Sequence, residues 1–466
     1  MAMPVWLKKF QQALSPAQII ALSFLFVILL GGFLLSLPIS HQENVDVPVL
    51  DAFFTAVSAV CVTGLVTVTT ASTWSLFGKL VILFLIQIGG LSLITLLTYF
   101  MVNFGKKVSL KDRLMIQTAF NHSSLGGMVK MVLLVIKGTL VCEALGAAIL
   151  FFSFAHQGVA WHKALFYGIF HAISAFCNAG FDIIGDQSLI PYSANLPINV
   201  VIMALIIIGG IGFTVWKDFV SKIMYFFSAH IKQRYHFSLH TKLALITTIA
   251  LIVGGMLFFL IAEYNNPQTI GGFSLPHKLL AALFQSVTLR TAGFATIAQN
   301  GLTEASKLIS SLLMLVGGSP GGTAGGMKTV TLAIIVCSVW SIIKGRKNIV
   351  VLKRTISVIT LQKSLTVIVL MLLLLFIGTA ILSATEDHTV FPHGISDLLF
   401  EVSSALGTVG LTTGITPYLS SIGKNVLMLC MFIGRIGPIT LIISLSHKVH
   451  NGDDLLGYPA EEVMIG

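Results

Sequence analysis

The chain has 466 residues, of which 55% are hydrophobic and 10% charged, and its formal net charge is +10 at pH 7. Such an apolar composition excludes an ordinary soluble domain and is typical of an all-α polytopic membrane protein. The basic residues lie mainly in the loops between apolar segments, as the topology of a membrane protein requires. This placement explains the positive charge, so no nucleic-acid partner is expected.

About eight apolar runs are long enough to cross a bilayer as helices, which takes roughly 20 residues each. In chain order they lie near Ala17 to Leu37, Ser75 to Phe104, Met128 to Phe154, Leu196 to Val215, Lys242 to Ala262, Leu308 to Trp340, Leu361 to Ala384 and Val426 to Ser446. Between the members of each pair lies a shorter apolar stretch, near Asp51 to Val60, Ala164 to Phe176, Leu279 to Leu289 and Asp397 to Leu406. Each short stretch is predicted to be a re-entrant helix, although any one alone would fit an interfacial helix.

Basic residues are unevenly divided between the two sides of this arrangement. One side carries most of the lysines and arginines, whereas the other carries only Lys79, Lys163, Lys278, Lys307 and Lys424. By the positive-inside rule, both termini are expected in the cytoplasm, and the short helices should enter from outside. The first span follows two lysines without a convincing cleavage site, so we expect it to be retained.

The short stretches and the residues after them form four aligned repeats. They read "SAVCVTGLV", "SAFCNAGFD", "QSVTLRTAGFA" and "SSALGTVGLT", with shared glycines at Gly64, Gly180, Gly293 and Gly410. The repeats are assigned to residues 1–105, 106–225, 226–347 and 348–446, followed by a tail at 447–466. Each unit crosses the membrane twice, so all four have the same orientation and can surround a central pore along the membrane normal.

Four glycine-containing loops around an axis have the chemistry of a cation filter. Backbone carbonyl oxygens can replace the water shell of a cation, and glycine permits backbone conformations that aim them at the axis. Thr63, Asn178, Thr291 and Thr408 can add side-chain oxygens or simply pack behind the loops. The alternative, that these glycines only allow close helix packing, leaves their regular spacing unexplained.

The sixth predicted span is interrupted by "GGSPGGTAGGMK" from Gly317 to Lys328. So many glycines cannot form a regular helix without a large free-energy cost, and irregular backbone at membrane depth must face protein or water. We therefore expect this segment to line the pore or a cleft, although Pro320 alone could produce a kink.

The whole chain resembles the membrane subunit of bacterial Ktr-type potassium uptake systems in the Trk/Ktr/HKT superfamily. The resemblance rests on the four loops, the glycine-rich interruption and the "GRIGP" run. It implies that carbonyl groups around each glycine bind potassium, at Val62, Thr63, Gly64, Leu65, Asn178, Ala179, Gly180, Phe181, Thr291, Ala292, Gly293, Phe294, Thr408, Val409, Gly410 and Leu411. It further implies sodium-stimulated uptake, a location in the bacterial plasma membrane, and no enzymatic activity.

The same resemblance implies a gate in the interrupted span and at Arg435. The gate residues would be Gly317, Gly318, Ser319, Pro320, Gly321, Gly322, Thr323, Gly325, Gly326, Lys328 and Arg435. A permanently charged guanidinium within a span is costly unless it faces water or a partner, so Arg435 is expected to be functional or to pair with a carboxylate such as Glu401. Lys328 could neutralise a carbonyl or extend to the inner interface. Arg290, Cys61, Cys177 and Gly407 are equivalent in the alignment and are expected only to pack behind the loops.

The resemblance also implies partners: a second copy of the chain in a homodimer, and a cytosolic ring of Rossmann-type subunits that bind nucleotide. The chain itself has no convincing phosphate-binding motif. The basic inner segments, which could equally anchor lipid headgroups, and the acidic tail "NGDDLLGYPAEEVMIG" are the expected contact regions.

Several other features favour structural roles. Asp51 and Asp397 precede two short helices and can cap them or attract cations. His171 is expected to be a hydrogen-bonded scaffold residue, and the five scattered cysteines form no disulfide or zinc pattern. An intramembrane enzyme would need clustered catalytic groups. The predicted spans have few acidic residues and no such cluster, so an enzyme is not expected. A coupled carrier for a monovalent cation such as sodium, the second hypothesis, would favour inverted repeats.

Overall fold

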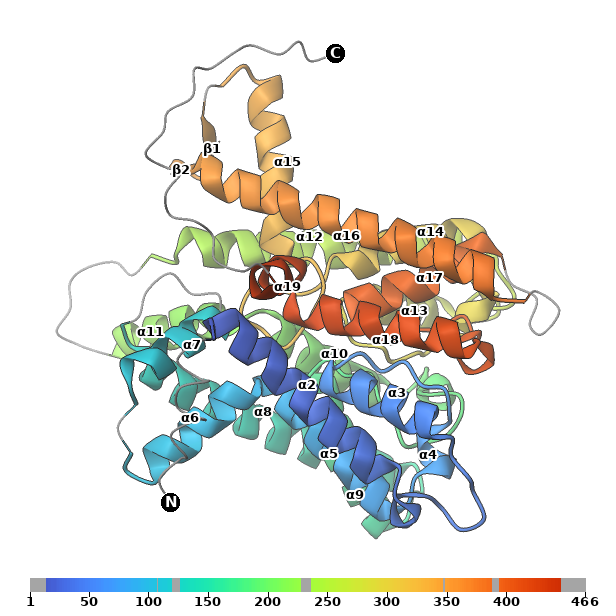
Figure 1. Ribbon diagram of the computed structural model, residues 1–466. Helices are drawn as coiled ribbons and strands as arrows, with labels where there is room; N and C mark the ends of the chain where they lie inside the picture. Colours follow the sequence, from blue (N-terminus) through green and yellow to red (C-terminus); the bar gives the residue numbers. More distant parts are fainter. Residues whose placement is uncertain are drawn as a thin grey trace.

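The computed structural model describes residues 14–106, 108–119, 126–227, 236–346, 348–387 and 394–445. The acidic tail at 447–466 and part of the basic segment before Phe237 lie outside the described residues. The described chain is helical apart from a small hairpin, which confirms the all-α class (Figure 1). The boundaries assigned to the repeats stay a prediction.

The first half of the chain holds two sets of helices. They are α2 (Pro16–Leu35), α3 (Val49–Val60), α4 (Thr70–Thr73), α5 (Leu76–Leu91) and α6 (Leu93–Asn103), then α7 (Leu110–Ala119), α8 (Met128–His156), α9 (Trp161–Phe176), α10 (Leu196–Gly210) and α11 (Phe213–Phe227). Short 3-10 turns lie at Pro38–Ser40 and Ile190–Tyr192. The helix starts follow local chemistry: Ser15 forms a capping box with Gln18, and Ser75 and Asn195 accept backbone N–H bonds at the starts of α5 and α10.

The second half repeats this order with one strand pair added. Its elements are α12 (Leu239–Ala262), α13 (Leu275–Thr288), α14 (Glu304–Leu315), α15 (Thr329–Ile343), β1 (Ile349–Val351), β2 (Arg354–Ile356), α16 (Val358–Thr385), α17 (Ile395–Gly407), α18 (Ser421–Ile436) and α19 (Pro438–Leu445), with 3-10 turns at Gln299–Gly301 and Thr416–Tyr418. The strands pair antiparallel, with Val350 opposite Thr355. Leu352 and Lys353 both have positive φ at the tip, as a two-residue hairpin turn requires.

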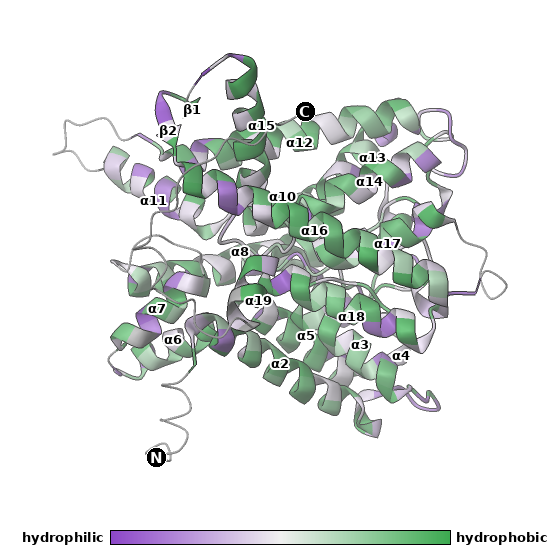
Figure 2. Ribbon diagram, turned by 45° about the horizontal axis from the view of Figure 1, so that its top comes forward, coloured by the Kyte–Doolittle hydropathy of each residue, from purple (hydrophilic) through white to green (hydrophobic). Residues whose placement is uncertain are grey.

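Four helices, α2, α8, α12 and α16, are long and apolar enough to cross a membrane. Two bent pairs pass the same test when each is counted as one span: α5 with α6, bent by 88°, and α10 with α11, bent by 97°. The remaining two predicted crossings, the sixth and the eighth, are divided, one between α14 and α15 and one between α18 and α19. Phe26, Phe152, Ile261 and Phe376, each on a different long helix, are 63, 69, 78 and 65% exposed, which fits lipid contact. Figure 2 shows the same apolar outer faces, with polar residues gathered at loops and the hairpin.

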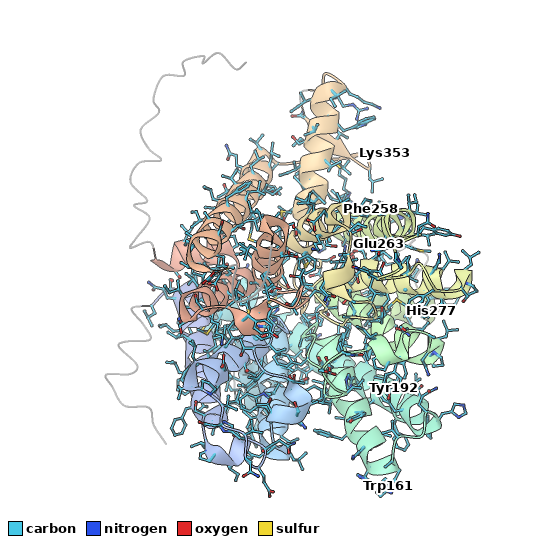
Figure 3. All side chains as sticks on the ribbon, turned by 90° about the vertical axis from the view of Figure 1, so that its right-hand side faces the viewer. Trp161, Tyr192, Phe258, Glu263, His277 and Lys353 are labelled. Atoms are coloured by element: carbon cyan, nitrogen blue, oxygen red, sulfur yellow. The ribbon has the colours of Figure 1, made fainter. Side chains whose placement is uncertain are left out.

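The helices form a closed ring. Each long helix packs on the short helix after it, in the pairs α2 with α3, α8 with α9, α12 with α13, and α16 with α17. The next helix of each set then contacts the short helix of the following set: α5 with α9, α10 with α13, α14 with α17, and α18 back to α3. In Figure 3 the chain accordingly passes around the centre in order, while Lys353 on the hairpin lies far from Trp161 at the opposite edge. The loops that follow the four short helices are thereby brought together.

Candidate functional site

Four loops, here called the glycine loops, follow the short helices at residues 62–65, 178–181, 291–294 and 408–411. Two residues before each glycine the backbone is left-handed, with φ of 56° at Val62, 60° at Asn178, 64° at Thr291 and 51° at Thr408. The glycines themselves have φ of 94° at Gly64, 68° at Gly180, 81° at Gly293 and 95° at Gly410. Positive φ is uncommon for residues with side chains, so its recurrence at four aligned positions means that the same loop is built four times.

The glycine loops meet each other edge to edge. A Cβ atom on Gly180 would lie 2.7 Å from the carbonyl oxygen of Ala292, and those on Gly64, Gly293 and Gly410 would lie even closer to the carbonyl oxygens of Ala179, Val409 and Thr63. Each glycine therefore abuts the next loop, and the fourth loop abuts the first. The following residues, Leu65, Phe181, Phe294 and Leu411, are buried in the hydrophobic core behind the loops.

Each glycine loop is braced by a hydroxyl group from its own short helix. Ser58 and Ser404 accept bonds of 3.0 Å from the N–H groups of Gly64 and Gly410, and Ser174 and Thr288 donate bonds of 2.7 Å to the carbonyl oxygens of Phe181 and Phe294. This role was not among the predictions from the sequence. The signal was present, because a Ser or Thr occurs near the start of every aligned stretch.

The interrupted segment between α14 and α15, here called the glycine-rich loop (residues 317–328), is folded back under the glycine loops. Its neck is closed by backbone bonds from Gly317 N to Met327 O, 2.8 Å, and from Met327 N to Leu315 O, 3.0 Å. Its tip contacts the second glycine loop, where Thr323 Oγ1 donates to Asn178 Oδ1 over 3.1 Å. A Cβ on Gly317 would lie 3.0 Å from the Thr291 side chain, and one on Gly325 would clash with Thr408. The segment therefore lies in the interior of the protein, against the glycine loops.

Three cationic side chains hold carbonyl groups of the glycine-rich loop. Arg435 donates to the carbonyl oxygens of Thr323 and Gly89, and to Gly90 O at 3.2 Å. Lys328 Nζ lies 2.6 Å from Ala324 O, so of the two roles considered for Lys328 the structure has the carbonyl contact. Arg290 Nη2 donates to Gly317 O over 3.1 Å, so Arg290 does more than the expected packing behind the third loop.

Glu401 is not the partner of Arg435. Its carboxylate accepts bonds from the Thr412 hydroxyl, from Thr413 N at 3.0 Å and from the Thr416 hydroxyl at 2.8 Å, all in the chain just after the fourth glycine loop. These local donors already satisfy the carboxylate, which leaves Arg435 to bind backbone carbonyl groups instead.

Two carboxylates, Asp51 and Asp397, join neighbouring sets of helices. Asp51 on α3 pairs with Lys424 on α18 at 2.7 Å, and Asp397 on α17 pairs with Lys307 on α14 at 2.9 Å. Asp397 also accepts a bond from Gly394 N and so caps α17 as anticipated, whereas no side-chain cap is formed at α3. His171 Nδ1 bonds to Tyr167 O within α9, in keeping with a scaffold role.

Four helix ends beside the ring share a motif that was not among the predictions from the sequence. The stretches "IGGLS", "IGGIG", "VGGSP" and "IGRIG" lie where α5, α10, α14 and α18 end. A Cβ on Gly89, Gly209 or Gly434 would clash with the last carbonyl groups of the short helices, at Val60, Phe176 and Leu406. The first glycine of the motif thus lets α5, α10 and α18 approach the end of a short helix, whereas Gly317 after α14 abuts Gly325 of its own loop. Arg435 occupies the place of the second glycine.

Comparison with known proteins gives one family. The family model TrkH, described as cation transport protein, matches residues 5–454. The potassium/sodium uptake protein NtpJ of Enterococcus hirae is 38% identical over 100% of both chains, and the Ktr system potassium uptake protein B of Bacillus subtilis is 38% identical over 97% of both. The crystal structure of the potassium transporter TrkH from Vibrio parahaemolyticus superposes with a TM-score of 0.67 at 20% identity, covering 91% of this chain and 84% of the other.

Proposed function

We propose that this chain, which belongs to the TrkH family of cation transport proteins, takes up potassium through a pore whose selectivity filter is the ring of four glycine loops. The family is one of membrane transporters and not of enzymes. The observation that carries the finer proposal is the closure of the ring, in which each glycine abuts a carbonyl group of the next loop.

The chemistry of the ring suits a dehydrated cation. The four short helices end at the loops, and their C-terminal partial negative charges converge there. The hydroxyl oxygens of Thr63 and Thr408 are buried without a hydrogen-bond partner in the described part of the chain. Since buried polar groups normally find a partner, these oxygens and the loop carbonyl groups are available to replace water around potassium.

We assign the gate to the glycine-rich loop, which includes Lys328, and to Arg435. The loop lies against three glycine loops, through Asn178, Thr291 and Thr408, and therefore obstructs the inner side of the ring. Arg435 ties the loop to α5 through Gly89 and Gly90 and adds a positive charge to the cation path. Opening requires these carbonyl contacts to break, which a regulatory partner can drive by binding the open state more tightly.

The remaining parts of the proposal concern assembly. Both termini, the hairpin and α11 are assigned to the cytoplasm, where a ring of Rossmann-type subunits would bind nucleotide and dock on a homodimer of this chain. The B. subtilis relative is named as one protein of a Ktr system, which supports such a partner. The E. hirae relative is named for potassium and sodium, which supports sodium as a second cation in uptake. A sodium-coupled carrier is the less favoured alternative, because the units close into a ring of like orientation.

Uptake of rubidium or potassium in a bacterial strain without its own potassium transporters tests the proposal. The chain is expressed alone, with a Ktr-type regulatory subunit, and as G410D with that subunit. We expect uptake that increases with the partner and is lost in G410D, although G410D still inserts. Absence of uptake by the wild-type chain from a confirmed membrane fraction would refute potassium transport, and retained potassium preference in G410D would remove the fourth loop from the filter.

A further inference from the structure

Arg290 lies at the end of a short helix, at an aligned position where the other three short helices have an uncharged residue. The residue three before each loop glycine is Cys61, Cys177, Arg290 or Gly407. All four are buried, and the Arg290 side chain is only 8% exposed. Three sectors of the ring therefore have neutral residues behind the glycine loop, and the third has a permanent positive charge.

The contacts of Arg290 join three segments. Its Nη2 atom donates to Gly317 O, and its own carbonyl oxygen accepts a bond of 3.3 Å from the Asn178 side chain. Asn178 also accepts the bond from Thr323. Arg290 thus links the second and third glycine loops to the neck of the glycine-rich loop.

No carboxylate in the described part of the chain forms a salt bridge with Arg290. Its Nη1 atom is buried without a hydrogen-bond partner there, and Arg290 lines a small cavity together with Thr248, Val287 and Gly318. An unpaired buried charge is expensive, so a residue needed only for packing would be better neutral. The charge itself must therefore have an effect.

The charge of Arg290 acts on the third glycine loop, which follows α13. The C-terminal end of α13 would otherwise attract a cation, and a guanidinium group at this end opposes that attraction. The field that the carbonyl groups of Thr291 and Ala292 exert on a bound cation is thereby weakened. Weaker-field ligands favour the larger, more easily dehydrated potassium ion over sodium when selectivity depends on ligand field strength.

Arg290 and Arg435 hold the glycine-rich loop at different places. Arg435 binds the tip at the carbonyl oxygen of Thr323, whose N–H group also bonds to Gly209 O at the end of α10, 3.2 Å, whereas Arg290 binds Gly317 at the neck. The neck is fixed by two backbone bonds, from Gly317 N and Met327 N. A tip can move while such a neck remains in place, so loss of the Arg290 contact need not release the obstruction.

We propose that Arg290 is a positioning and specificity-determining residue, which fixes the third glycine loop against the stationary neck and biases the filter toward potassium through its charge. This inference rests on the proposed filter. It assigns Arg290 to selection between cations and leaves control of opening to the tip of the loop and Arg435.

The test is rubidium uptake in competition with sodium, measured for R290Q, R290K and the wild type with the regulatory subunit. R290Q removes the charge. In this variant we expect sodium to inhibit rubidium uptake at a several-fold lower concentration, because the Coulomb energy between the buried charge and a cation in the filter is lost. R290K retains the charge and should discriminate like the wild type. Uptake without the partner should stay low in both variants, unlike in R435A.

Each other outcome overturns the inference. Unchanged discrimination in R290Q would make Arg290 a packing residue, and high partner-independent uptake with unchanged discrimination would make it part of the gate. Equal loss of discrimination in R290Q and R290K would mean that shape and not charge matters. If R290Q does not reach the membrane, R290K is the deciding variant. Altered discrimination between rubidium and sodium in R290K would contradict the role of the charge. Absence of wild-type uptake would instead refute the proposed function itself.

Discussion

The hydroxyl group of Thr323 donates a hydrogen bond to the side-chain oxygen of Asn178, across 145 positions of sequence. The same hydroxyl lies 3.2 Å from the carbonyl oxygen of Phe176, at the end of α9. One side chain of the glycine-rich loop thus contacts both the second glycine loop and the short helix that carries it. This contact links the proposed gate directly to the proposed filter.

Replacement of Thr323 by valine should favour the open gate. Valine has nearly the same shape, but it removes the donor and leaves the buried side-chain oxygen of Asn178 unpaired, a loss of about 1–2 kcal/mol from the closed arrangement. We expect rubidium uptake without the regulatory subunit to rise several-fold. Thr323→Ser keeps the hydroxyl and serves as the control. Equal basal uptake in the valine variant and the wild type would show that the contact does not hold the loop closed.

Gly64→Ala should abolish selective uptake. The new methyl group would have to enter the space of the Ala179 carbonyl, and the φ of 94° is strained for alanine. Gly254→Ala on α12 is the matched control, because a Cβ there meets no neighbouring atom within 4 Å. Potassium uptake is expected to be lost in the first variant and retained in the second. Normal potassium preference in Gly64→Ala would exclude the first loop from the filter.

Arg435→Ala, and separately a deletion within Gly317 to Gly326, should raise uptake in the absence of the partner. Both changes remove carbonyl contacts that hold the glycine-rich loop under the ring. Arg354→Ala on β2 removes a surface arginine and should leave uptake unchanged. The measurement is the initial rate of rubidium entry, normalised to the amount of protein in the membrane. Unchanged rates in both gate variants would place the gate elsewhere.

Uptake should fall when the external pH decreases through about 6. Burial raises the pKa of Asp182, two residues beyond Gly180, to about 6, although bonds from Ser188 and the N–H groups of Ile184 and Gly185 act to lower it. The carboxylate is therefore charged at pH 7, where it attracts cations, and neutral at pH 5. Because the folded-state pKa is raised, ionisation of Asp182 lowers stability as the pH rises, so loss of uptake in acid would not come from unfolding through this group.

Asp182→Asn is the test of this pH effect. It should show reduced uptake at pH 7 and a flatter pH profile between 7 and 5, whereas Asp46→Asn, at an exposed position in another loop, should keep the wild-type profile. An Asp182→Asn protein with the wild-type profile would mean that another group titrates.

Several elements could be predicted because their signals are local. The stretch Ala164 to Phe176 corresponds to α9, Trp161–Phe176, and the interruption after Gly317 separates α14 from α15. A short apolar run and a cluster of glycines act on their own segment of chain, whatever surrounds them. The break of α5 from α6 at Ser92, with φ of 69°, was missed since the apolar run continues through it. There, contacts with the end of a short helix determine the backbone.

The sequence by itself determined the class of protein, the four aligned units and the four glycines, because hydropathy and repetition are properties of the linear order. The tertiary structure alone decided the partners of the buried charges. Arg435 could have paired with Glu401, but local hydroxyl groups occupy that carboxylate, and the arginine binds carbonyl groups of α5 and the glycine-rich loop. Likewise Arg290 has a role only because Gly317 lies beside it. Pairing of a buried charge depends on which oxygen atoms the folded chain leaves free within reach, and no interval along the sequence specifies that.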